Sequence, residues 1–188
     1  MSVRFPWIGM IVVCLLFPPV LNAQGAGSVS YKIDGKIFEF KDALLEYYVE
    51  DGYISITCEK KETVKLPSAP GGKEEVAAGM TIQLFEVEES IVGVHETSSA
   101  DDMPVYFTWY ELVPEKDGQP AGIRHFTAGL DTGDEDRMIM RLKIDNFGPE
   151  GTLVKGTFSG KLFDQDDVLH EITDGTFSVP RKDVKDEG

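Results

Sequence analysis

The side chains best suited to chemistry are carboxylates gathered in two acidic turns. Residues 129–136 hold three candidate calcium ligands, Asp131, Asp134 and Asp136, and residues 164–167 form a second aspartate-rich turn. Calcium needs several oxygen ligands that converge on one point, and aspartate-rich loops between strands can supply them. The first turn lacks the EF-hand order, because the twelfth position is leucine and not glutamate. A solvated turn that keeps strand edges apart is therefore the competing interpretation.

Three histidines are the other candidate ligands, at positions 95, 125 and 170. Two of them precede a glutamate, but neighbouring residues on a strand point to opposite faces, so neither pair chelates a metal by itself. The chain also lacks the nucleophile elbow, the phosphate-binding loop and the helical zinc motif of hydrolases. A hydrolase that uses a carboxylate pair or a histidine-bound metal remains an alternative, since convergent sites are recognised by geometry.

The cysteine outside the N-terminal segment is expected to be inert. Cys58 follows Ile54 and Ile56 on the same face of an alternating strand, so the pattern predicts a buried thiol. The neighbouring Glu59 would raise the pKa of the thiol, whereas a nucleophile needs a lowered pKa. A single cysteine also leaves the domain without an internal disulfide.

The elements that must position any functional site are short runs of alternating apolar and polar residues, separated by turns rich in Gly, Pro, Asp and Asn. We count about ten such runs at intervals of roughly ten residues. The pattern predicts an all-β fold, an antiparallel β-sandwich, with a closed lipocalin-like barrel as the alternative. Residues 42–50 fit either a helix or a strand, and the Asp51-Gly52 turn that follows favours a strand.

The most aromatic run, residues 105–113, is expected to be a buried central strand. Valine, phenylalanine and tryptophan take one face and the tyrosines the other. An aromatic sugar-binding platform is the functional alternative for this run. A second alternative is a carrier, in which a barrel interior lined by Phe107, Trp109, Phe158 and Phe177 holds a small apolar ligand.

The N-terminus has the layout of a secretory signal peptide. Arg4 precedes an apolar run, which ends in two prolines and the small residues before position 24. Cleavage after Ala23, uncertain by about two residues, leaves a single domain over 24–180. The charged segment 181–188 is expected to be an unfolded tail.

The net charge of the chain limits the kinds of partner that it is expected to bind. The full chain has a formal net charge of −15, and loss of Arg4 with the signal peptide makes it about −16. Such a chain is repelled by nucleic acid and by anionic lipid, and no basic patch in the sequence offsets this. We therefore expect a secreted or periplasmic protein without stable membrane insertion, for which calcium or an unknown protein or small-molecule partner is permitted.

The closing stretch, residues 152–180, contains two Gly-Thr-Phe-Ser segments, in GTFSG at 156–160 and ITDGTFSV at 172–179. It predicts an antiparallel hairpin with its phenylalanines in the core. These motifs resemble the ending of a loose group of small secreted all-β bacterial proteins of uncharacterised function. The resemblance implies a β domain outside the cytoplasm and brings no activity. We expect a non-catalytic binding, accessory or structural module, with any function in the loops 62–79, 98–103 and 129–136.

Overall fold

The computed structural model describes most of the chain as β-structure. It covers residues 26–64, 74–85, 91–97, 104–113, 122–128, 139–164 and 166–185. Eleven strands account for most of these residues, and none of the described residues is helical, so the prediction of an all-β fold is confirmed. The strands are β1 Ser28–Ile33, β2 Lys36–Lys41, β3 Leu44–Tyr48, β4 Tyr53–Val64, β5 Glu74–Leu84, β6 Gly93–Thr97, β7 Val105–Val113, β8 Gly122–Ala128, β9 Met140–Asn146, β10 Leu153–Asp164 and β11 Leu169–Val184.

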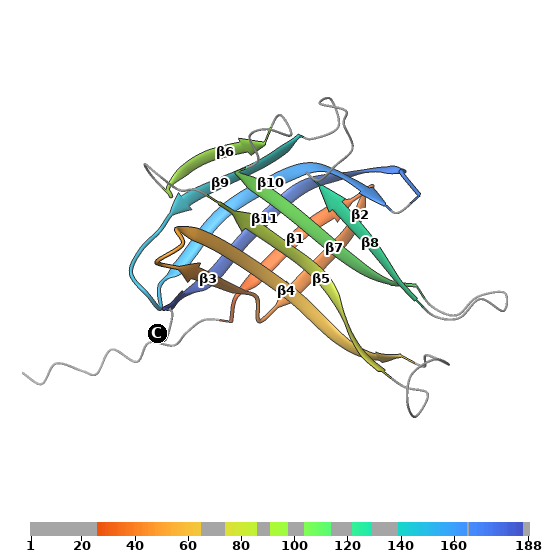
Figure 1. Cartoon of the computed structure of the whole chain (residues 1–188), viewed down its shortest axis with the longest axis horizontal. Coiled ribbons are helices and arrows are strands. Elements are labelled where there is room, and N and C mark those ends of the chain that lie inside the picture. Colours follow the sequence, from red (N-terminus) through yellow and green to blue (C-terminus); the bar gives the residue numbers. More distant parts are fainter. Residues whose placement is uncertain are drawn as a thin grey trace, which may run out of the picture.

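The strands lie in two layers that cross at a steep angle (Figure 1). Strands β4, β5, β7 and β8 run side by side in one layer, and β2, β1, β11, β10, β9 and β6 follow one another in the other. Side chains from both layers meet in the core: the rings of Phe107 on β7 and Phe158 on β10 pack edge to face, with their centroids 5.5 Å apart. The two layers thus pack face to face, as the layers of a sandwich do.

Hydrogen bonds also join the two layers, so that all eleven strands form one mixed sheet. At one corner β11 pairs with β3 in parallel, through four residue pairs. At the other corner β10 meets β8 through only two pairs. The expectation of a purely antiparallel fold is therefore wrong at one pairing, where the end of β11 runs alongside β3 in the same direction.

The hairpin of β10 and β11 is the centre of the structure, since each strand has partners on both edges. Its register places Thr157 opposite Thr176. Each phenylalanine of the repeated motif then lies opposite a glycine of the other strand: Phe158 opposite Gly175, and Phe177 opposite Gly156. The repeat thus encodes two rings that each fill the space left by a missing side chain, and both strands are in register as predicted.

Two segments that the sequence predicts to be irregular are instead continuations of strands. Arg181–Val184 continue β11 and pair with β3, so the segment 181–188 is not wholly an unfolded tail. The predicted loop 62–79 is also shorter than expected, because β4 runs to Val64 and β5 begins at Glu74. In both cases pairing with a neighbouring strand supplies the backbone hydrogen bonds that residues of low strand propensity lack by themselves.

The remaining predicted segments fall outside the described residues. These are the signal peptide 1–23 and the loops 98–103 and 129–136. Within the part of the chain that the structure describes, no helix has the length and apolar character needed to cross a membrane.

Candidate functional site

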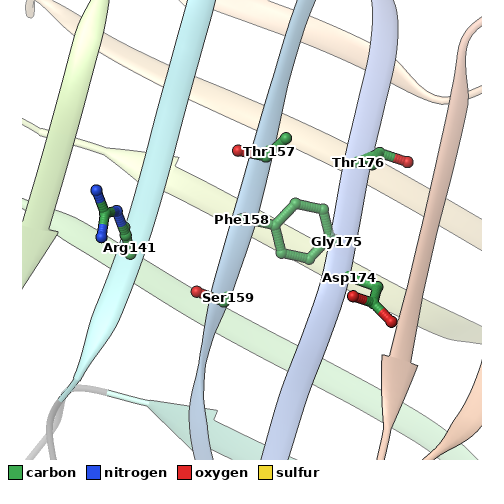
Figure 2. A pocket seen from close by; sticks show the side chains of 7 residues that line it. All are labelled: Arg141, Thr157, Phe158, Ser159, Asp174, Gly175 and Thr176. Atoms are coloured by element: carbon green, nitrogen blue, oxygen red, sulfur yellow. The ribbon is translucent and has the colours of Figure 1, made fainter.

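An open hollow lies on the outer face of the central hairpin, across strands β9, β10 and β11 (Figure 2). Its volume is about 390 Å³. This is within the range of sites that bind small ligands, which starts at roughly 300 Å³. The residues that line it are Arg141 on β9, Thr157, Phe158 and Ser159 on β10, and Asp174, Gly175 and Thr176 on β11.

A β-bulge in β11 shapes one wall of the hollow. Thr173 and Asp174 together face the single residue Ser159 of β10, and the register of β11 with β1 shifts at the same place. Asp174 has a φ of 53°, in the left-handed region that aspartate tolerates better than most residues. The extra residue sends the Asp174 carboxylate to the outer surface, where its side chain is 69% exposed. Bulges commonly re-aim a side chain next to functional sites.

The hollow presents polar atoms that the described residues leave unpaired. The hydroxyls of Thr157, Ser159 and Thr176 make no hydrogen bond to another described residue. Asp174 accepts one contact, from Lys32 Nζ to Oδ2 at 2.7 Å, and its Oδ1 has no described partner. Arg141 contacts Glu96 through Nε alone, at 3.2 Å from Oε1. Three hydroxyls, one carboxylate oxygen and two guanidinium amino groups are therefore available to a ligand.

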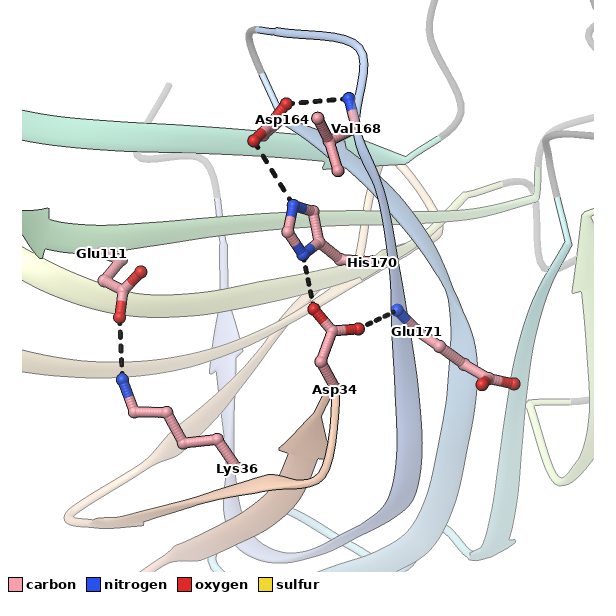
Figure 3. A network of polar contacts seen from close by, with 7 residues as sticks. All are labelled: Asp34, Lys36, Glu111, Asp164, Val168, His170 and Glu171. Carbon is pink, nitrogen blue, oxygen red and sulfur yellow. Dashed lines mark hydrogen bonds and ion pairs between the residues drawn. The ribbon is translucent and has the colours of Figure 1, made fainter.

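The second polar arrangement is a chain of contacts centred on His170 (Figure 3). Nδ1 of His170 lies 2.6 Å from Oδ2 of Asp34, in the turn between β1 and β2, and Nε2 lies 3.4 Å from Oδ2 of Asp164 at the end of β10. The edge of the imidazole meets the ring of Phe126 on β8 at 5.0 Å between centroids. The β1–β2 turn, the end of β10 and β8 are thus joined to β11 at one point.

Both carboxylates of this network are also held by backbone amides. Oδ1 of Asp34 accepts the amide of Glu171 at 3.0 Å, and Oδ1 of Asp164 accepts the amides of Asp166 and Val168 at 2.9 Å each. Because both nitrogens of His170 contact a carboxylate, neither is available to take a proton from a substrate. The network therefore fixes the end of the sandwich, and we assign it no catalytic role.

Hydrogen bonds lower the pKa of both carboxylates. Partial desolvation opposes ionisation of Asp34, but the bonds from Glu171 and His170 outweigh it and lower its pKa. For Asp164 the amide of Val168 is the largest influence, and with His170 and the Asp166 amide it lowers the pKa despite desolvation. A carboxyl with a depressed folded pKa stabilises the fold above its unfolded pKa, and this contribution is lost as the pH falls through the folded value.

We therefore predict a pH-dependent effect of Asp164→Asn, which keeps an acceptor oxygen but removes the charge. At pH 7 the variant should melt at a lower temperature than the wild type. The difference should close as the pH falls from about 4 through the folded pKa of Asp164, because both proteins are then neutral at this position. Asp145→Asn is the control, since Asp145 pairs with Lys143 on the surface. An Asp164→Asn deficit that is the same at pH 7 and pH 3 would contradict the assignment.

Comparisons of the chain with protein-family models, with curated proteins and with solved structures found no match. The resemblance of the closing hairpin to small secreted β proteins stays a prediction.

The predicted metal ligands are not brought together among the described residues. Asp131, Asp134 and Asp136 lie outside them, and no group of three His, Cys, Asp or Glu side chains within them could hold a metal. The three histidines have separate surroundings. His95 contacts the carbonyl of Ile91, His125 stacks on Tyr110, and His170 lies between its two carboxylates.

The thiol and the aromatic strand follow the sequence patterns. Cys58 is buried, and desolvation raises its pKa to about 12 even though it donates to the Met80 carbonyl.

In the aromatic strand β7, Trp109 is buried, while Tyr110 on the other face is exposed and stacks on His125, with the two rings 6° from parallel and their centroids 4.7 Å apart. Each of these two rings covers a face of the other. A sugar-binding platform on this strand stays a prediction.

The side chains proposed to line a carrier interior are buried and in contact. Phe107, Trp109, Phe158 and Phe177 are each at most 4% exposed. Phe107 packs on Phe158, and Trp109 packs on Phe126 at 4.3 Å between centroids. Tyr31, which packs on Phe158, is the single residue among those described whose buried polar atom lacks a hydrogen bond. Ring contacts therefore fill this part of the interior.

Asp174 and its hollow were missed by sequence reasoning, although a signal for them exists. Ile172 and Phe177 are both apolar and both buried, yet they are an odd number of residues apart. A strict two-residue alternation cannot place both on the core face, so one residue between them must be extra. The Asp174-Gly175 pair marks the place, because these residue types tolerate unusual backbone angles.

Proposed function

We propose that this protein is a non-catalytic binding module of the secreted or periplasmic space, and that its ligand is a small polyhydroxylated molecule bound in the hollow over β9, β10 and β11. The observation that supports this most is the set of unpaired polar atoms around the hollow. They include the hydroxyls of Thr157, Ser159 and Thr176, which can donate as well as accept. A ligand that carries many hydroxyls, such as a saccharide, matches these groups.

The surroundings of the hollow favour binding over catalysis. Its carboxylate, that of Asp174, is exposed and paired with Lys32, and no second carboxylate is among the side chains that line it. Glycoside cleavage needs two carboxyl groups facing each other across the bond. The hollow also sits on strands of the central hairpin, and sites on such rigid elements hold their geometry well.

The test is a titration of the purified, isotope-labelled protein with a panel of neutral and acidic mono- and oligosaccharides, followed by amide chemical shifts. At least one saccharide should shift the amides of Thr157, Ser159, Gly175 and Thr176. Thr157→Tyr should abolish these shifts by filling the hollow. Tyrosine suits a strand, so the variant should fold.

Thr108→Tyr, on the outer face of the opposite layer, is the matched control and should leave binding unchanged. The proposal fails if no saccharide in the panel shifts the amides around the hollow. It also fails if Thr157→Tyr binds as well as the control.

A further inference from the structure

We infer that the ligand of the hollow is an acidic saccharide, whose carboxylate binds Arg141 and whose hydroxyls bind Asp174 and the neighbouring Ser and Thr side chains. This inference rests on the proposed function and names its ligand class. It comes from the two opposite charges at the ends of the hollow, on β9 and on β11 (Figure 2).

Arg141 provides the positive end. Its side chain is 57% exposed, and its one charged contact uses Nε and not the two terminal amino groups. A guanidinium binds a carboxylate most strongly through two parallel N–H donors. The two terminal amino groups of Arg141 can make this paired contact with the carboxylate of a ligand. The existing pair with Glu96 is no obstacle, because Glu96 is itself 55% exposed and exposed ion pairs contribute little.

Asp174 provides the negative end. The bulge places its carboxylate on the rim, with Oδ1 unpaired among the described residues and Oδ2 held by Lys32. An ionised carboxylate only accepts hydrogen bonds, so it suits the hydroxyls of a sugar ring and repels a second carboxylate. A ligand with one acidic group is therefore oriented, with its carboxylate towards β9 and its hydroxyls towards β11.

The floor between the two ends is uncharged and hydroxylated. Thr157 and Thr176 face each other across β10 and β11, and Ser159 lies next to Arg141 in the register of β10 with β9. Phe158, the one aromatic residue that lines the hollow, is only 3% exposed, so little of its ring is offered to an apolar group. A purely apolar or aromatic ligand would leave these hydroxyls without partners, which costs binding free energy.

Basic side chains beside the hollow matter because the chain as a whole is strongly negative. A protein with a formal net charge of −15 repels anions at long range. On the outer face next to the hollow, however, Lys143, which pairs with Asp145, lies beside Thr157 in the register, and Lys155 has no ion pair to another described residue. Together with Arg141 they offset the general repulsion where the carboxylate would bind.

The experiment compares methyl glucuronoside, which carries one carboxylate, with its methyl ester, which keeps the sugar ring and removes the negative charge. The acid should bind the purified protein about tenfold more tightly, as expected for a hydrogen-bonded pair with a charged group. Arg141→Gln should bind the acid and the ester equally. Arg141→Lys should keep only part of the preference, because an ammonium cannot make the paired contact.

Two controls separate local pairing from general charge. Glu96→Gln frees Arg141 and should leave the preference for the acid intact or increase it. Lys155→Gln removes the same charge as Arg141→Gln from a neighbouring outer position, and should change the preference much less. A preference that falls equally in Lys155→Gln and Arg141→Gln would overturn the inference.

The results also distinguish the inference from the proposed function. If the ester shifts the amides around the hollow as strongly as the acid, the acidic ligand is wrong and the binding module stands. If neither shifts them, and no other saccharide of the panel does so, both fail together. Binding of the acid that survives Thr157→Tyr would place it outside the hollow and contradict both.

Discussion

Replacing Gly175 with alanine should lower the free energy of unfolding by about 2 to 3 kcal/mol, the usual cost of an overpacked core. A Cβ atom at this position would lie 2.7 Å from two ring carbons of Phe158 and would also press on the carbonyl oxygen of that residue. Phe158 cannot move away easily, because Tyr31 and Phe107 pack on its ring. Urea denaturation of the variant and the wild type measures the difference.

Gly160→Ala is the matched control on the facing strand. The nearest atom to its Cβ would be the carbonyl oxygen of Ile139 at 3.0 Å, with no ring carbon close by. This variant should therefore lose less stability than Gly175→Ala. Equal losses in the two variants would mean that the ring of Phe158 does not confine position 175.

A second substitution tests the contact directly. Phe158→Ala removes both ring carbons that lie close to position 175, so the double variant Gly175→Ala with Phe158→Ala should be more stable than the sum of the two single effects predicts. Residues in contact commonly show such coupling, of about 0.5 to 3 kcal/mol. The clash with the backbone carbonyl remains, so the rescue should be partial. Strictly additive losses would contradict the packing of the ring on the glycine.

The same hairpin shows what a sequence pattern can predict. Alternation is a local property, so it correctly placed Val154, Phe158 and Leu162 in the core. The repeated motif also predicted that both strands share a register. Alternation within one strand does not tell which residue of the other strand lies opposite. The pairing of each phenylalanine with a glycine therefore depends on how the two strands are aligned. Turn length and the buried face together fix that alignment.

The hollow was harder to predict, for a physical reason. It is formed by an interruption of the alternation at Asp174, and by side chains from three strands that only the sheet order brings together. The alternation of residues 138–144 places Arg141 on the outer face of its strand, but it does not tell which strands lie beside it. The site was expected in the loops, whereas the hollow lies on strands, because loop composition says nothing about the outer face of a sheet.

Residues 181–184 were predicted wrongly because the composition of the segment 181–188 is that of a disordered segment. Residues 181–188 are mostly charged, and charged segments usually cannot bury enough apolar surface to fold. Arg181 escapes this rule because its flat guanidinium lies over two rings, 4.9 Å from the centroid of Tyr47 and 4.2 Å from that of Phe147. A cation over aromatic rings can be buried together with them.

Truncation after Pro180 should therefore destabilise the whole domain, by more than Arg181→Lys alone. It removes the parallel pairing of β11 with β3, and with it the bond from Arg181 Nη1 to the Gly148 carbonyl at 2.6 Å. Arg181 and Asp183 form a pair whose side chains are only 13% and 17% exposed. Arg181→Lys keeps the charge but loses the forked contacts, at an expected cost of about 2 kcal/mol.

Removal of residues 186–188 alone is the control, because it leaves β11 complete to Val184. This control should melt at the temperature of the full chain, whereas truncation after Pro180 should melt well below it. Since the amide of Arg181 also bonds the Thr152 carbonyl at 3.0 Å, just before β10, amide exchange should quicken at the open end of the central hairpin, where β10 begins. A truncated protein with unchanged melting and exchange would show that residues 181–184 add nothing to the fold.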